Sequence, residues 1–587
     1  MKKRFIAALM STAIMGSVVT GCGSMGVSNG VTVDDETPAI TEKEMTLYML
    51  NLEDERTHKF YFLGDSDVPY VSLSDWAELM TDIKQHYMDD VGEISFSLKY
   101  TKDGDTGVLT REDGSPYTAA FDCKADTITF FDYDAFLRST DDMALLDLLS
   151  DEHPEYFNRL DGTYERYGDQ LVLDLGAYGI DMVTEGDECY VPLQTLSDFF
   201  LALDYRNIFY NGEEVFLVKY SGLGNTLSGE DYTPLGEKFY SVKPGERSEA
   251  MGEYSYAELC LVFDHLYGLK DVHRFESFKR LTEETGFREA LMGSDPDQAD
   301  EALMRIIDFH LDDVHSIFLD TSPSSERGKA MELYQELGFG KSYADLQNLA
   351  SEYSSARAQF YPDGVPSYEE IGNTAYITFD SFVSPDDANY YDKQPTAKAK
   401  DTFGIMLYAY SQIMRENSPI ENVVLDLSVN GGGSSDAAIF VLSAFLGEGY
   451  ASLMNSMTGA LTTGVYAVDM NLDKEFNDGD DGFLEKNLYC LISPVSFSCG
   501  NLVPNVFKNS NRVTLLGRTS GGGSCAVLSM SIAYGTSFQI SGPKRLAFTK
   551  NGSFYDIDQG AVPDYSLTKT ESFYDRTALS DYIRSLK

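Results

Sequence analysis

From about residue 371 the sequence alternates short apolar runs with helical patterns, and this alternation is the strongest constraint on the fold. The pattern predicts strands at 374–379, 423–427, 488–492 and 513–516, and helices at 398–415, 437–446 and 500–509. Strands that alternate with helices form parallel βαβ units, in which ligands bind beyond the carboxyl ends of the strands. We therefore predict a parallel α/β core with its site at that edge.

Two loops with unusual composition follow strands of this core. Residues 426–433 read Asp-Leu-Ser-Val-Asn-Gly-Gly-Gly, and consecutive glycines let the backbone point N–H groups at a phosphate or an oxyanion. The Gly-Lys-Ser/Thr of a P-loop and the GxGxxG spacing are both missing. Residues 493–501 read Ser-Pro-Val-Ser-Phe-Ser-Cys-Gly-Asn and lead into a helix. Such a serine is commonly a helix cap, but it also suits a nucleophile beside the positive end of a helix.

Four segments in order resemble motifs of the S41 serine peptidases, the family of the C-terminal processing proteases and the tricorn core. Segment 426–433 resembles "D-L-R-x-N-G-G-G", 496–501 resembles "S-x-S-A-G-E", 515–523 resembles "i-G-x-x-T-x-G-G", and 560–564 resembles "G-(V/I)-x-P-D". The resemblance implies an α/β catalytic core of ClpP/crotonase-like βαβ units over 321–587. A small helical subdomain at 254–320 would precede it. We expect no PDZ domain, because residues 320–370 are too few for one.

The resemblance also implies roles for individual residues. Ser498 would be the nucleophile, and the N–H of Cys499 with that of Gly431 or Gly432 would form the oxyanion hole. Family members with a Ser-Lys dyad carry "T-x-G-K-G", whereas Gly522 stands in the place of that lysine here. The branch similar to the tricorn core, which takes its base from a "D-G-H-T" or "S-H" motif, is therefore the better match.

A histidine occupies the position that this branch uses for its base. The helical segment ends in Asp313-Val-His315-Ser316, and an imidazole has the near-neutral pKa that a general base needs. The adjacent carboxylate is placed to fix its tautomer. The family's orienting acid lies just before the "G-x-x-P-D" motif, where Asp558 is the nearest candidate and Asp556 the next.

The N-terminus predicts export and lipid anchoring. Three basic residues precede an apolar stretch at 5–19, which is too short to span a bilayer and is typical of a secretory signal. Val19-Thr-Gly-Cys22 resembles the bacterial lipobox, whose cysteine is lipidated after cleavage. We therefore expect a signal peptide at 1–21 and a flexible tether at 22–42 that begins with lipidated Cys22. The protein would be anchored to the bacterial cell membrane and face the extracytoplasmic side.

Residues 43–222 are expected to form an α+β module, followed by a linker at 223–253. Two passages, 68–76 and 189–198, echo one another, and each precedes an apolar helical stretch. The second continues into a predicted hairpin with its turn at Asn211-Gly212. The pattern resembles the stalk modules named after the N-terminal domain of copper amine oxidases, which implies a scaffold or binding role without copper chemistry.

Composition excludes several kinds of partner. The chain has 45 Lys and Arg against 94 Asp and Glu, a net charge of -49, so it repels phosphate backbones and nucleic acid is excluded. The cysteines after Cys22 show neither metal-ligand spacing nor the density of a disulfide scaffold. A metal-dependent hydrolase built on His310, Asp313 and His315 lacks HExxH-type spacing. We predict no metal and no cofactor.

The leading hypothesis is a membrane-anchored, extracytoplasmic serine endopeptidase. It would cleave peptide bonds through an acyl-enzyme on Ser498, with His315 as base, and its partner would be a peptide or protein substrate. The alternative is a catalytically inactive S41-like lipoprotein that binds peptides or cell-wall polymers. Its motivation is that Asn501 and Ser428 replace the Glu and the Arg of the family motifs.

Overall fold

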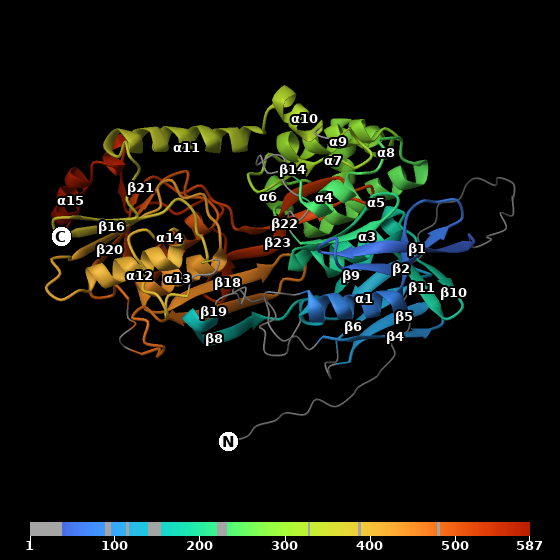
Figure 1. Cartoon of the computed structure of the whole chain (residues 1–587), viewed down its shortest axis with the longest axis horizontal. Helices are drawn as coiled ribbons and strands as arrows, with labels where there is room; N and C mark the ends of the chain where they lie inside the picture. Colours follow the sequence, from blue (N-terminus) through green and yellow to red (C-terminus); the bar gives the residue numbers. More distant parts are fainter. Residues whose placement is uncertain are drawn as a thin grey trace, which may run out of the picture. The chain divides into compact units, whose positions relative to one another are not determined.

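The structure is a computed structural model that describes residues 38–87, 96–112, 117–138, 154–219, 223, 232–326, 329–385, 389–477, 480 and 482–586. The expected signal peptide, Cys22 and the tether up to residue 37 lie outside these residues. No helix in the described ranges is long and apolar enough to cross a bilayer. Contacts divide the chain into Met1–Ala39 and Ile40–Lys587, and every element named below belongs to the second unit (Figure 1).

The predicted parallel core is present as a six-stranded sheet in the order β15-β16-β17-β20-β21-β25. Its strands are β15 (Tyr368–Ile371), β16 (Thr374–Thr378), β17 (Asn422–Asp426), β20 (Asn487–Ile492), β21 (Val513–Gly517) and β25 (Tyr565–Ser566). Neighbours from β16 to β25 run parallel, and β15 is antiparallel to β16. Strands β16 and β17 are buried along their whole length, as expected where helices cover both faces of a parallel sheet.

Helices do cover both faces. One face packs against α12 (Thr402–Ile413), α13 (Ser435–Leu446) and α14 (Cys499–Ser510). The other face packs against α11 (Lys341–Phe360), α15 (Arg576–Ser585) and the short 3-10 helix η7 (Thr570–Phe573). The strands and helices predicted for this region are confirmed, and only their ends differ by a few residues.

The N-terminal segment contains two sheets. The first has the order β10-β11-β3-β2-β1-β13-β12 and consists of β1 (Ile40–Met49), β2 (Glu55–Leu63), β3 (Tyr70–Ser72), β10 (Val183–Glu185), β11 (Glu188–Pro192), β12 (Arg206–Tyr210) and β13 (Val215–Lys219). The second has the order β4-β5-β6-β7-β9 and consists of β4 (Leu98–Asp103), β5 (Thr106–Arg111), β6 (Thr118–Asp122), β7 (Thr127–Phe130) and β9 (Leu171–Asp174). Helices α1 (Leu73–His86), α2 (Tyr133–Leu137) and α3 (Leu193–Phe200) accompany them, with short 3-10 helices at η1 (Pro154–Tyr156), η2 (Gly176–Tyr178) and η3 (Ala202–Asp204).

The two passages that echo one another in the sequence are structural equivalents that lie side by side. Each forms a short strand that leads directly into a helix, β3 into α1 and β11 into α3. Strands β3 and β11 pair with each other in antiparallel register, with Val71 opposite Val191. The hairpin predicted around Asn211-Gly212 is confirmed as β12 and β13.

A helical segment connects these sheets to the parallel core. It contains α4 (Pro234–Phe239), α5 (Glu249–Leu266), α6 (Lys270–His273), α7 (Phe278–Thr285), α8 (Arg288–Met292), α9 (Pro296–Met304), the π-helix η5 (Arg305–Leu311) and α10 (Lys329–Leu337). Helix α5 begins before residue 254 because the hydroxyl of Ser248 accepts the N–H of Met251 and caps it. The expected linker at 223–253 therefore holds α4 and the start of α5.

A third sheet joins parts of the chain that are far apart in sequence. Its order is β14-β23-β18-β19-β8, and β22 and β24 also pair with β23. The strands are β8 (Phe157–Arg166), β14 (Ile317–Asp320), β18 (Gly449–Asn455), β19 (Leu461–Val468), β22 (Cys525–Ser531), β23 (Ser537–Lys550) and β24 (Ser553–Tyr555). Strand β8 comes from the expected N-terminal module and β14 from the helical segment, so both segments add a strand to a sheet of the later chain.

Strand β23 connects the two large hydrophobic cores. Phe538 and Ile540 belong to the core shared by the N-terminal sheets and the helical segment. Ala547 and Phe548 belong to the core beneath the parallel sheet. Because one continuous strand enters both cores, it connects the helical segment with the parallel core.

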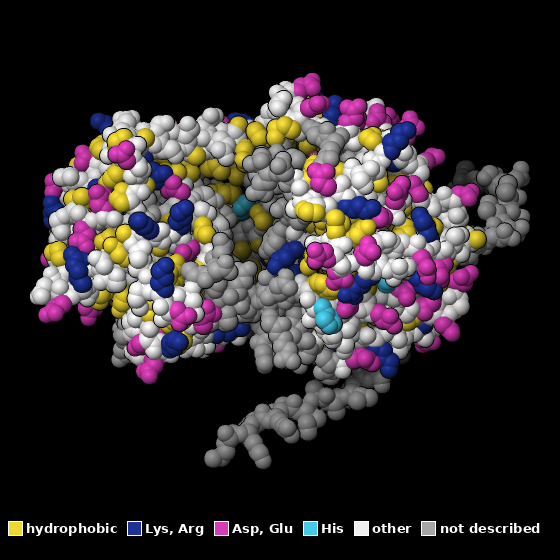
Figure 2. Space-filling view, viewed as in Figure 1, with side chains coloured by type: hydrophobic (Ala, Val, Ile, Leu, Met, Phe, Trp, Pro, Cys, Tyr) yellow, Lys and Arg dark blue, Asp and Glu magenta, His cyan; other side chains and the backbone are white. Residues whose placement is uncertain are grey.

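Charged side chains are dispersed over the face shown in Figure 2, with acidic groups spread over the surface and basic groups between them. This distribution agrees with the net charge of -49.

Candidate active site

Ser498 sits in a strained turn between β20 and α14. Its backbone has φ 55° and ψ -124°, a combination that costs a residue with a Cβ on the order of 1–3 kcal/mol. The turn is held because the N–H of Ser498 donates to the Gly522 carbonyl at 2.9 Å and the N–H of Leu502 donates to the Ser498 carbonyl at 2.9 Å. Such a turn between strand and helix presents a serine hydroxyl outward.

The hydroxyl of Ser498 is not used for capping. Ser498 is the N-cap residue of α14 by position, yet its side chain makes no capping hydrogen bond. Among the described residues no partner binds its Oγ, and the residue is only partly buried. The helix-cap interpretation of this serine is therefore wrong, and its hydroxyl is available to a ligand.

The glycine loop lies directly against this serine. A Cβ on Gly432, whose φ is 110°, would lie 2.6 Å from the Cβ of Ser498 and 3.1 Å from its Oγ. No side chain fits there, which explains why the loop carries glycine at this position. The carboxyl ends of β17 and β20 thus meet as predicted, and they bring residues 426–433 and 493–498 together.

The N–H groups near Ser498 differ in availability. Gly431 donates to the carbonyl of Asp380 at 3.1 Å, and Gly432 donates to Asn430 Oδ1 at 2.9 Å, so both expected glycine donors are engaged in this structure. Within the described residues, the N–H groups of Cys499 and Gly433 have no acceptor. Of the three expected donors, Cys499 is therefore available whereas Gly431 and Gly432 are not, and Gly433 offers a further available N–H group.

Gly522 leaves no room for a lysine in the second glycine-rich loop. Its φ is 87°, and a Cβ would lie 2.3 Å from the carbonyl oxygen of Asp558. Its own carbonyl accepts the N–H of Ser498. The missing lysine is therefore matched by a backbone geometry that only glycine adopts without strain.

His315 lies next to the serine turn in space. It follows the π-helix η5 and precedes β14; its N–H donates to Asp313 Oδ1 at 3.2 Å, and its carbonyl accepts Gln539 Nε2 at 2.7 Å. Its ring packs on Phe497, with 4.6 Å between ring centroids, and the residue is 8% exposed. Between His315 and Ser498, both of them described, there is no side-chain hydrogen bond in this structure.

Burial decides the charge of His315. It lowers the pKa of the imidazole below 6.5, and the negative charges of Asp313 and then Asp558 oppose this effect without reversing it. The ring is therefore neutral at pH 7, which is the form that accepts a proton.

The two candidate acids are held by different partners. Asp558 accepts the N–H of Ser524 at 2.6 Å and also pairs with Arg545. Asp556 pairs with the same guanidinium at 3.0 Å. Asp313, in contrast, has no cationic partner among the described residues and accepts the hydroxyl of Ser316 at 2.6 Å. Asp558 is therefore within electrostatic reach of His315, but its charge is compensated by Arg545.

Cys499 does not compete with Ser498 as a nucleophile. Its thiol is buried and donates to the carbonyl of Gly433 at 3.1 Å. Burial raises the pKa of this thiol to about 12, so the thiolate is not populated at neutral pH.

The two departures from the family motifs have structural roles. Asn501 donates to the carbonyl of Ile557 at 3.0 Å and accepts the hydroxyl of Ser520 at 2.7 Å, which ties α14 to the loop before β25. The hydroxyl of Ser428 donates to Asp426 Oδ1 at 2.7 Å, and the buried guanidinium of Arg576 from α15 lies 3.4 Å from Asp426 Oδ2. Sequence reasoning missed Arg576 because α15 lies outside the motifs.

One group of carboxylates among the described residues could hold a metal ion. It comprises Asp469, Asp473 and Asp480, whose candidate ligand atoms lie within 4.8 Å of one another. These residues follow β19 and do not include His310, Asp313 or His315. The histidine-based metal site considered from the sequence is therefore not among the described metal-ligand groups.

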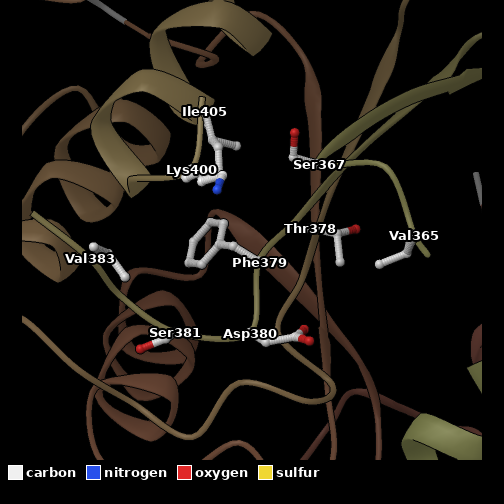
Figure 3. Close-up of a pocket in the computed structure, with 9 residues that line it drawn as sticks. All are labelled: Val365, Ser367, Thr378, Phe379, Asp380, Ser381, Val383, Lys400 and Ile405. Carbon is white, nitrogen blue, oxygen red and sulfur yellow. The ribbon is translucent and has the colours of Figure 1, made fainter. Parts of the chain in front are cut away.

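A pocket of about 290 Å³ opens beside the glycine loop (Figure 3). It is lined by two residues before β15, by the end of β16 and the segment that follows it, and by residues just before and within the first turn of α12. The sequence offered no signal for this pocket, because its lining comes from three separate stretches of chain.

Comparisons with known proteins agree with the motifs. Residues 373–567 match the model of peptidase family S41. A protein of Chlamydia pneumoniae is 30% identical over 113 residues, which are 17% of this chain and 16% of that protein.

Solved structures with low sequence identity were also found. A putative peptidase from Parabacteroides merdae is 15% identical, covers 57% of this chain and 96% of its own, and has a TM-score of 0.41. The photosystem II D1 C-terminal processing protease is 17% identical, covers 33% of this chain and 42% of its own, and has a TM-score of 0.25. Mature CPAF complexed with lactacystin is 10% identical, covers 57% of this chain and 98% of its own, and has a TM-score of 0.35.

The family match contains both the glycine loop and the serine turn that lie against one another in the structure. It also contains the parallel strands from which these loops arise, because β16 begins at Thr374 and β25 ends at Ser566. Residues 373–567, which contain these strands and both loops, are therefore similar to peptidase family S41, a family of serine peptidases.

Proposed function

We propose that this protein is a serine endopeptidase that cleaves peptide bonds through an acyl-enzyme on Ser498, with His315 as general base. The observation that carries the proposal is the turn at Ser498, whose φ of 55° is held by backbone hydrogen bonds while Oγ has no partner among the described residues. Strain of this kind is retained where it positions a reacting group.

The proposed reaction begins with attack of Ser498 Oγ on the carbonyl carbon of the scissile bond, as His315 takes the hydroxyl proton. The tetrahedral oxyanion would accept the N–H of Cys499, at the start of α14, and the N–H of Gly433. Collapse breaks the C–N bond, and protonated His315 delivers its proton to the leaving amine. A water molecule, deprotonated by His315, then hydrolyses the ester on Ser498.

His315 must turn toward Ser498 for this reaction. Its ring now contacts Phe497, the residue directly before the proposed nucleophile, which supports a place for His315 beside the serine turn. Catalytic hydrogen bonds are often long or absent before substrate binds and form in the substrate complex. Asp313 and Asp558 both place negative charge near the imidazole and would stabilise the imidazolium that forms.

The proposal is tested by mapping a covalent adduct. A fluorophosphonate reacts with a serine made nucleophilic by a base, so the folded protein should acquire one adduct that peptide mass spectrometry places on Ser498. The heat-unfolded protein is the control and should remain unlabelled. An adduct on another residue would contradict the assignment. No adduct together with saturable peptide binding would instead support the inactive, peptide-binding alternative.

We further propose that the protein is held on the extracytoplasmic side of a bacterial membrane through lipidated Cys22. The support is the lipobox-like sequence Val19-Thr-Gly-Cys22 after a short apolar stretch. In a bacterial host, Cys22→Ala should move most of the protein from the membrane fraction to the soluble fraction, as measured by immunoblotting after detergent-free lysis. Cys123→Ala, which changes a cysteine outside this motif, should stay with the membrane. Equal distribution of the two variants would contradict the anchor.

A further inference from the structure

The pocket in Figure 3 combines an apolar floor with one amino group. Its apolar side chains come from Val365, Phe379, Val383 and Ile405. Its polar and charged side chains come from Ser367, Thr378, Asp380, Ser381 and Lys400. Lys400 lies just before α12 and points toward the ring of Phe379 in this view. Such a lining suits a side chain with an aliphatic stem and a charged end.

A single residue, Gly432, connects the lining of the pocket to the proposed nucleophile. The hydroxyl of Ser381 donates to the carbonyl of Gly432 at 3.1 Å, and the N–H of Phe382 donates to the same oxygen at 2.8 Å. Gly432 in turn lies directly against Ser498. A peptide bound with its carbonyl at Ser498 would therefore have a neighbouring side chain within reach of the pocket.

The charge of Lys400 is not compensated inside the pocket. Among the lining residues the only acid is Asp380, whose carboxylate accepts both terminal nitrogens of Arg357, at 2.7 and 2.5 Å. This carboxylate points away from Lys400 in Figure 3. No carboxylate among the described residues forms an ion pair with Lys400. The positive charge of Lys400 is therefore available to a ligand in the pocket.

We propose that this pocket is a substrate subsite that binds a carboxylate-bearing residue of the peptide. The aliphatic stem would lie on Phe379 and Ile405, and the carboxylate would pair with Lys400. The carboxylate has two sources with the same chemistry, the side chain of a Glu or Asp and the α-carboxylate of a C-terminal residue. This inference rests on the proposed peptidase function of the adjacent Ser498.

The expected selectivity is moderate and depends on salt. Lys400 is exposed at the rim, and an exposed ion pair contributes about 0.2–1 kcal/mol, or roughly 1.4- to 5-fold in affinity. Reversing the charge changes attraction into repulsion, so the preference between a Glu and a Lys peptide should shift by about 10-fold at low salt. Raising the salt from about 0.02 to 0.5 M should remove most of this shift.

The experiment measures peptide binding and cleavage separately. Binding to the Ser498→Ala protein is followed by fluorescence anisotropy with matched peptides that carry Glu, Gln or Lys at one position, each as free acid and as C-terminal amide. Lys400→Glu is added to this background, and Lys398→Glu is the matched control. Both changes lower the net charge equally, so the long-range field of the acidic protein is the same. Lys398 is exposed and does not line the pocket.

The proposal predicts that Lys400→Glu reverses the preference for Glu over Lys peptides and that Lys398→Glu does not. If Lys400→Glu removes only the preference for free acids over amides, the ligand is the C-terminal carboxylate. If it changes only the preference for Glu over Lys peptides, the ligand is the side chain. An unchanged preference in Lys400→Glu would overturn the subsite. Cleavage is measured with the protein that retains Ser498. If that protein shows neither cleavage nor fluorophosphonate labelling, the peptidase function is contradicted, whatever the binding experiment shows.

Discussion

Replacing Ser498 with alanine is expected to lower peptide turnover by about 10³- to 10⁶-fold. The reason is that the reaction loses its only proposed covalent partner, while substrate binding and the nearby N–H donors remain. The substitution should leave stability nearly unchanged, because the Oγ has no hydrogen-bond partner among the described residues and alanine keeps the Cβ that the turn already accommodates. Measurement of kcat/KM on a cleaved peptide, with thermal unfolding of the same preparation, checks both parts.

A matched control is available at the other end of the same helix. Ser510 closes α14, is partly buried, and donates to the carbonyl of Phe507 at 2.7 Å. Ser510→Ala should keep turnover within about 2-fold, since it touches no part of the proposed site. Full activity in Ser498→Ala would assign the chemistry to another residue, and an equal loss in both variants would point to an unfolding artefact.

Replacing His315 with glutamine is expected to lower turnover by about 10²- to 10⁴-fold, the usual contribution of a general base. The pH profile separates this role from a structural one. A base acts in its neutral form, so kcat/KM should rise as the pH passes upward through the pKa of His315. Burial lowers the pKa of this imidazole, so the midpoint of the rise should lie below 6.5, and kcat/KM should level off above that midpoint.

The control for this prediction is His310, an exposed histidine five positions earlier in the π-helix η5. His310→Gln should keep both the turnover and the acidic limb of the pH profile. The acidic limb should disappear in His315→Gln, because the group that titrates has been removed. An unchanged midpoint in that variant would show that another group is the base.

The parallel core was predictable because its signals are local. Strand and helix periods, the run of glycines after β17 and the serine-rich turn after β20 all report on a few neighbouring residues, and the structure places them as expected. The same holds for the two echoing passages, whose short strands β3 and β11 pair with each other. The four motif-like segments also occur in the same order as the motifs of the S41 family, and the family match over 373–567 agrees with that order.

Other features of the site depend on contacts between distant segments. The position of His315 follows from the pairing of β14 with β23 and from the packing of its ring on Phe497. The pairing of Asp558 with Arg545 also requires the tertiary structure. A single sequence contains no local pattern that reports such pairs, because the hydrophobic effect that drives their packing has no direction.

The sequence by itself determined the strand and helix pattern of the parallel core, the loops that lie at its edge, and the serine that occupies the turn. These follow from the backbone preferences of neighbouring residues, whereas the close approach of Ser498 that explains the glycine at position 432 is seen only in the folded chain. The tertiary structure alone decided that His315 is buried and neutral and that the N–H groups of Gly431 and Gly432 are already engaged. It also decided that Lys400, which has no acidic partner among the described residues, lines a pocket near Ser498. The physical reason is that burial, hydrogen-bond satisfaction and charge compensation depend on which distant residues come into contact, and these contacts form only when the chain folds.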